Sequence, residues 1–112
     1  MRCSKITENM VQDQILTWLK IKGIFAWRNN NGATFDSRRG AYRIRGKHEL
    51  NGVPDIIGIL PDGKFLGIEV KKPGGKTSDD QDLFINNGKL YGAIVFCADD
   101  LKTVQTELNK YI

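Results

Sequence analysis

Long apolar runs are missing from this sequence of 112 residues. The longest are Ala93–Ala98 and Ile56–Leu60, the second interrupted by Gly58, and a membrane-spanning helix needs about 20 apolar residues. The first ten residues, MRCSKITENM, contain no apolar stretch of the kind found in a signal peptide. We therefore expect a soluble, cytoplasmic protein that makes no use of a membrane.

Cysteine and histidine are also scarce. Cys3 and Cys97 show no CxxC or Cys/His spacing, which argues against a disulfide framework and against a zinc site. The only histidine, His48, follows a basic segment, and we expect it at the surface or against a polyanion rather than acting as a general base. With no internal repeat, linker or low-complexity stretch, residues 1–112 are predicted to form a single domain.

Positive charge is concentrated in one segment, at about residues 28–47. Two readings remain open: a solvated loop, which is the usual meaning of a charge run, or an arm that contacts nucleic-acid phosphates. Against a single acid, Asp36, the segment carries Arg28, Arg38, Arg39, Arg43, Arg45 and Lys47.

The spacing of apolar residues predicts an α/β domain with a mixed central sheet flanked by helices, in the order α-β-(β)-β-β-α-β-α. The first helix is expected to begin after Ser4 or Thr7 and to stop at Gly23. The register of the bracketed strand is not settled by its sequence. The predicted segments are a helix over 5–22, strands over 24–29, 41–46, 54–60 and 64–72, a helix capped by Ser78 and ended by Gly92, a strand over 93–98 and a helix over 99–112.

A tight turn is predicted at Pro61-Asp62-Gly63, because proline presets φ, aspartate caps locally and glycine accepts positive φ. Strands joined this closely form an antiparallel hairpin. Pairing about this turn places residues whose numbers sum to about 124 opposite each other, so Asp55 faces Glu69.

The hairpin carries charges where a strand core is normally apolar. Side chains alternate across a strand, so Glu69 and Lys71 share one face. A salt bridge of Lys71 with Glu69 or with Asp55 explains one acid and leaves the other unpaired. A magnesium ion held by both carboxylates removes that surplus, with Lys71 beside the attacking water, which is the chemistry of phosphodiester hydrolysis.

Two further features of the sequence bear on function. The stretch GGKT suggests a phosphate-binding loop, but that motif needs a glycine where Val70 stands, so no nucleotide cofactor is expected. Glu8 extends the apolar stripe of the first helix by one turn. On the helix alone, a favourable interaction with the helix dipole explains well why a carboxylate lies in the first turn.

The stretch GVPD, ending at Asp55, followed fourteen residues later by Glu69-Val70-Lys71, resembles the PD-(D/E)XK nuclease superfamily. The early helical Glu8 and a following helix that starts near Gln81 make the chain similar to the VRR-NUC group within it. The resemblance implies Mg²⁺, or Mn²⁺ as a substitute, on Asp55, Glu69 and the Val70 main-chain carbonyl.

The resemblance also implies that Glu8 assists the metal or water, that Lys71 acts on the attacking water, and that Gln81 positions water or phosphate. Lys72 and Lys76 would approach the DNA backbone. We therefore expect a metal-dependent DNA endonuclease, acting as a homodimer on branched DNA such as Holliday junctions in a bacterial or phage-infected cell. The alternatives are a restriction-type duplex endonuclease and a non-catalytic DNA-binding module on the same scaffold.

Overall fold

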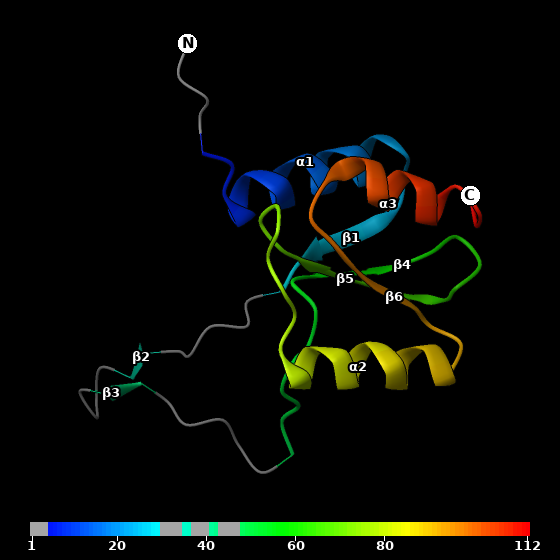
Figure 1. Cartoon of the computed structure of the whole chain (residues 1–112). Coiled ribbons are helices and arrows are strands. Elements are labelled where there is room, and N and C mark those ends of the chain that lie inside the picture. The colour runs from blue at the N-terminus through cyan, green and yellow to red at the C-terminus, as the bar shows by residue number, and fades with distance from the viewer. Residues whose placement is uncertain (1–4, 30–34, 37–40, 43–47) are drawn as a thin grey trace.

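A four-stranded mixed sheet organises the chain in the computed structural model, which describes residues 5–29, 35–36, 41–42 and 48–112 (Figure 1). Its strand order is β1-β4-β5-β6, antiparallel except for the parallel pair β5–β6. The predicted α/β architecture is confirmed. In chain order the elements are α1 (Glu8–Ile21), β1 (Phe25–Arg28), β2 (Phe35–Asp36), β3 (Ala41–Tyr42), β4 (Ile56–Ile59), β5 (Phe65–Val70), α2 (Asp79–Leu90), β6 (Ile94–Ala98) and α3 (Leu101–Leu108).

The first helix begins and ends where its sequence signals predict. The Thr7 hydroxyl accepts a hydrogen bond from the Met10 backbone nitrogen at 3.2 Å and so caps α1. At the other end Gly23 has a φ of 74°, a left-handed conformation that glycine adopts without penalty.

The hairpin of β4 and β5 has the register expected from its turn. Ile56 lies opposite Ile68, and Gly63 in the turn has a φ of 91°. The Asp62 carboxylate accepts a hydrogen bond from the Lys64 backbone nitrogen at 3.0 Å. This register brings the residue before β4 next to the end of β5.

Helices cover both faces of the sheet, with α1 and α3 on one side and α2 on the other (Figure 1). The core lies on the side of α1 and α3, where Leu66, Ile68 and Val70 of β5 are fully buried. Alternation then turns Gly67 and Glu69 toward the side of α2. On the core side, the residues of α1 and α3 that pack with Leu66, Ile68 and Val70 are Val11, Ile15, Leu19, Val104 and Leu108.

The α2 face is covered unevenly, because α2 packs mainly against β6. On the other half of this face Phe25 is 67% exposed and Trp27 is 41% exposed, with their ring centroids 5.1 Å apart. Aromatic residues at strand spacing normally lie in a core. These two are exposed because, within the described part of the chain, no helix lies over the β1 edge on this side.

The segment between β1 and β4 is described only in part. Residues 35–36 and 41–42 form a separate two-stranded antiparallel sheet in which Phe35 pairs with Tyr42. The strand expected over 41–46 therefore pairs with β2 as far as the described residues extend. Among the helices in the described ranges, none has the length and apolar character needed to cross a membrane.

Candidate active site

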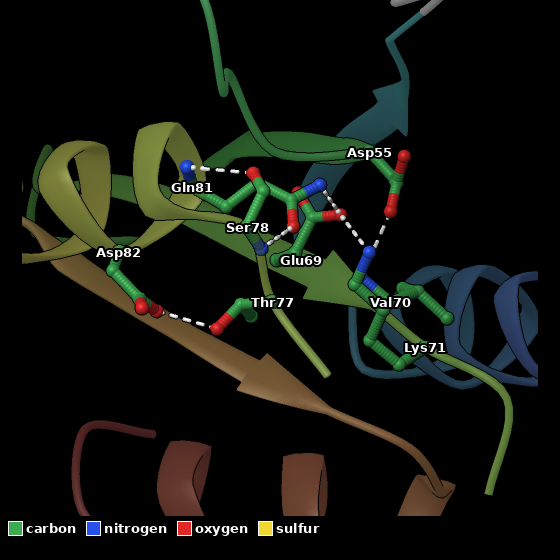
Figure 2. A network of polar contacts seen from close by, with 8 residues as sticks. All are labelled: Asp55, Glu69, Val70, Lys71, Thr77, Ser78, Gln81 and Asp82. Carbon is green, nitrogen blue, oxygen red and sulfur yellow. Dashed lines mark hydrogen bonds and ion pairs between the residues drawn. The ribbon is translucent and has the colours of Figure 1, made fainter. Parts of the chain in front are cut away.

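Asp55 is fixed at the start of β4 by its neighbours on both sides. Its Oδ2 atom accepts a hydrogen bond from the Val70 backbone nitrogen at 2.9 Å (Figure 2). On the other side the Asn29 backbone nitrogen donates to the Asp55 carbonyl at 2.7 Å, and the Asn29 amide donates to the Pro54 carbonyl at 3.3 Å. The carboxylate is therefore held beside the end of β5 by backbone contacts.

Glu69 is a buried carboxylate whose two oxygens have different surroundings. Only 2% of the residue is exposed. Its Oε1 atom accepts a hydrogen bond from the Gln81 amide nitrogen at 2.8 Å and lies 3.6 Å from the Lys71 ammonium (Figure 2). Its Oε2 atom is buried and has no hydrogen-bond partner among the described residues. A buried oxygen without a donor is costly, so this atom needs an explanation.

The surroundings also change the acidity of Glu69. Burial, followed by the nearby negative charge of Asp55, raises the pKa of Glu69 from 4.5 to about 8, and the Lys71 ammonium opposes this only in part. The negative charge of Asp55 therefore disfavours the charged form of Glu69. A simple Glu69–Lys71 salt bridge would leave Oε2 unpaired and Asp55 uncompensated.

A divalent cation fits this donor set. Mg²⁺ is bound in proteins by one or two carboxylates, other oxygen atoms and several waters. Asp55 and Glu69 provide the carboxylates, and the Val70 carbonyl is expected on the Asp55 side of β5, where the Val70 N–H already points. Cys97 lies opposite Glu69 in β6, and burial raises the pKa of its thiol, so it adds no further negative charge. In the described ranges no three His, Cys, Asp or Glu side chains converge to form a larger cluster.

Gln81 lies at the site through the start of α2. Its side-chain oxygen accepts a hydrogen bond from the Ser78 backbone nitrogen at 2.8 Å, while its side-chain nitrogen donates to Glu69. In return the Ser78 hydroxyl accepts from the Gln81 backbone nitrogen at 3.2 Å. In this geometry Gln81 holds a carboxylate, whereas the resemblance implied that it positions water or phosphate.

Glu8 is not brought together with the other acids in this arrangement. It is an exposed residue in the first turn of α1, and no hydrogen bond or ion pair within the described part of the chain joins it to Asp55 or Glu69. One turn further along, Gln12 is 7% exposed on the buried face of the helix. The role of Glu8 stays a prediction.

The basic residues expected to bind DNA can be placed only in part. Lys72 and Lys76 are exposed in the connection between β5 and α2. Arg28 forms an exposed ion pair with Asp13 at 2.6 Å. Outside the described residues lie Arg38, Arg39, Arg43, Arg45 and Lys47.

Sequence reasoning assigned no structural role to Gly52 or Asn29. Gly52 has a φ of 77°, and a Cβ atom there would lie 2.8 Å from the Gln81 backbone nitrogen and closer still to the Asp80 carbonyl. The loop leading to Asp55 therefore lies directly against the first turn of α2. For Asn29 no sequence signal exists, because its contacts depend on strand pairing.

Comparison with known proteins agrees with this geometry. The family model of the VRR-NUC domain matches residues 6–96. A solved structure described as a VRR_NUC domain has a TM-score of 0.67 at 21% identity, over 96% of this chain and 100% of that chain. A second, described as a VRR_NUC domain protein, has the same TM-score at 22% identity, over 98% of this chain and 91% of that chain. No curated protein matches this chain significantly.

Proposed function

Because the chain belongs to the VRR-NUC family of the PD-(D/E)XK nuclease superfamily, we propose that it is a divalent-metal-dependent endonuclease that hydrolyses DNA phosphodiester bonds. The observation that carries the proposal is the buried Glu69 Oε2 atom, which has no donor among the described residues and belongs to a carboxylate crowded by Asp55. A site that only stabilised the fold would be expected to pair this oxygen.

Asp55 and Glu69, with the Val70 carbonyl and the assistance of Glu8, would hold Mg²⁺ or Mn²⁺. When bound, the cation supplies positive charge that stabilises the charge developing on the phosphate oxygens. Lys71 lies on the same face as Glu69 and is 15% exposed, so its ammonium reaches the site while remaining partly shielded from bulk water. Lys71 Nζ orients the attacking water or accepts a proton from it.

The proposal extends to the substrate and the assembly. We propose branched DNA, such as a four-way junction, cut by a homodimer, because two symmetric incisions require two symmetric sites. A cytoplasmic setting remains the expectation from the sequence.

The test is incubation with Mg²⁺, and separately with Mn²⁺, of linear duplex, single-stranded, flap and four-way-junction DNA in parallel. The expected result is metal-dependent cutting of branched DNA in preference to linear duplex. Cutting of linear duplex at fixed sequences would favour the restriction-type alternative. Binding of DNA without cutting of any substrate would contradict the nuclease proposal and favour the non-catalytic module.

Replacing Lys71 by alanine should lower the cleavage rate by about 10²–10⁴-fold, the range typical for the loss of a group that handles a proton. DNA affinity should stay nearly unchanged, because Lys71 is largely buried against Glu69. Single-turnover cleavage and a filter-binding or anisotropy assay measure the two effects. The matched control is Lys72→Ala, which removes an exposed neighbouring lysine and should weaken binding more than turnover. Equal loss of binding and cleavage in Lys71→Ala would point to a structural salt bridge.

Neutralising Arg38, Arg39 and Arg43 together tests the basic segment. If these residues bind phosphates, the slope of log affinity against log salt concentration should fall by about 0.9 for each phosphate of duplex DNA that is no longer neutralised. DNA affinity measured across a salt series gives this slope. The control Lys102→Gln changes a charge on α3 and should leave the slope as it is. An unchanged slope in the triple variant would remove the segment from the DNA interface.

A further inference from the structure

The start of α2 carries a capping box that does more than begin a helix. In such a box the capping residue and the third helical residue satisfy each other's backbone N–H groups, here Ser78 and Gln81. The side-chain nitrogen of the glutamine takes no part in the box itself and can donate to another group. Here the amide nitrogen of Gln81 donates to Oε1 of the buried Glu69 at 2.8 Å.

Both ends of the Gln81 side-chain amide are therefore hydrogen-bonded within the protein. An amide oxygen only accepts and an amide nitrogen only donates. The Ser78 N–H holds the oxygen end, so the nitrogen end is directed at Glu69 (Figure 2). The Ser78 hydroxyl also fixes the backbone of Gln81, because it accepts a hydrogen bond from the Gln81 backbone nitrogen. Ser78 thus fixes both the backbone and the side-chain amide of Gln81.

The turn itself is held in place from two further directions. Gly52 lies against the backbone of Asp80 and Gln81 so closely that a side chain would not fit. The Thr77 hydroxyl donates a hydrogen bond to the Asp82 carboxylate across the start of the helix. The loop that ends at Asp55 and the turn that carries Gln81 are therefore parts of one packed unit.

We propose that Ser78 is a positioning residue of the metal centre. Through Gln81 it keeps Oε1 of Glu69 occupied by a protein donor and so presents Oε2 as the oxygen available to a divalent cation. This inference rests on the proposed function, and it deepens it by assigning a role to a residue outside the PD-(D/E)XK signature.

The experiment measures Mn²⁺ affinity by calorimetry, without DNA, on variants of the 112-residue chain whose thermal melting confirms that they fold. Gln81→Met keeps the length of the side chain and removes both amide ends, and Ser78→Pro removes both the hydroxyl and the N–H at a residue whose φ of −83° is close to that of proline. Both should weaken Mn²⁺ binding by about 10–100-fold, the usual effect of losing a group that orients a metal ligand. Ser78→Ala keeps the N–H and should lose less, and Ser78→Thr should bind Mn²⁺ like the wild type.

The matched control is Asp100→Ala. Asp100 caps α3 by accepting from the Thr103 backbone nitrogen at 2.8 Å, so this variant also loses a helix cap but should keep its Mn²⁺ affinity. If Gln81→Met and Ser78→Pro bind Mn²⁺ like the wild type, the positioning role is wrong, whereas the nuclease proposal stands. If the wild type itself neither binds Mn²⁺ nor cuts DNA, the proposed function fails, and the positioning role fails with it.

Discussion

Replacing Glu69 by glutamine should abolish DNA cleavage and, at the same time, stabilise the metal-free protein at pH 8. Glutamine has the same shape, and its oxygen can still accept the hydrogen bond that Gln81 donates to Oε1. It removes a charge that burial and Asp55 both disfavour. Loss of activity together with a gain in stability would identify Glu69 as a residue kept for function, because most substitutions of buried residues destabilise.

The pH dependence of this gain follows from the shifted pKa. In the unfolded chain Glu69 loses its proton near pH 4.5, whereas in the folded protein it does so at about pH 8. Between these values the unfolded state binds fewer protons, so the contribution of Glu69 to the free energy of unfolding falls as pH rises. One pKa unit corresponds to about 1.4 kcal/mol, so the loss amounts to a few kcal/mol at pH 8.

Urea unfolding in EDTA at several pH values from 5 to 8 measures this effect. The stability of the wild type should decline over this range relative to that of Glu69→Gln. The control Glu107→Gln, which alters a carboxylate that pairs with Lys110 at the surface of α3, should keep the slope of the wild type. Parallel curves for the wild type and Glu69→Gln would show that the folded structure does not raise the pKa of Glu69.

Replacing Gly52 by alanine should destabilise the protein by about 2–5 kcal/mol. The left-handed φ of 77° costs a non-glycine residue about 1–2 kcal/mol, and overpacking in a tight contact adds about 1–3 kcal/mol. The new methyl group would meet the backbone of Asp80 and Gln81, which cannot move away as the end of a side chain can. Cleavage should fall as well, because the same loop leads to Asp55.

The control for this prediction is Gly74→Ala. Gly74 has a φ of 81°, but no heavy atom outside Gly74 and its two chain neighbours lies within 4 Å of the position that its Cβ would take. This variant should therefore lose only the conformational part, about 1–2 kcal/mol. Both free energies of unfolding are measured by urea denaturation in EDTA. Equal losses in the two variants would mean that the close approach of Gly52 to α2 contributes nothing.

Local signals were enough to predict the hairpin and the face that carries Glu69 and Lys71. The turn at residues 61–63 set the register, and alternation along β5 placed Glu69 and Lys71 on the same face. The N-cap of α2 was likewise readable at Ser78, and the glutamine three residues later is the sequence signature of a capping box.

What the sequence did not reveal depends on contacts between distant segments. The burial of Glu69, the lack of a partner for its Oε2 atom among the described residues and the packing of Gly52 against Asp80 all depend on how strands, loops and α2 come together in the fold. The exposure of Trp27 has the same origin, because it depends on where α2 lies over the sheet. The role of Glu8 stays a prediction, because the local pattern places this residue on a helix but does not determine how far it lies from Asp55.

Binding of Mn²⁺ to the wild type and to Glu69→Gln, followed by electron paramagnetic resonance at pH 8 without DNA, tests most directly whether the buried acids form a metal centre. The wild type should bind Mn²⁺, and the Glu69→Gln variant should lose most of this binding while remaining folded. The surface control Glu107→Gln should bind like the wild type. Equal Mn²⁺ binding by the wild type and Glu69→Gln would contradict the assignment of Glu69 as a metal ligand.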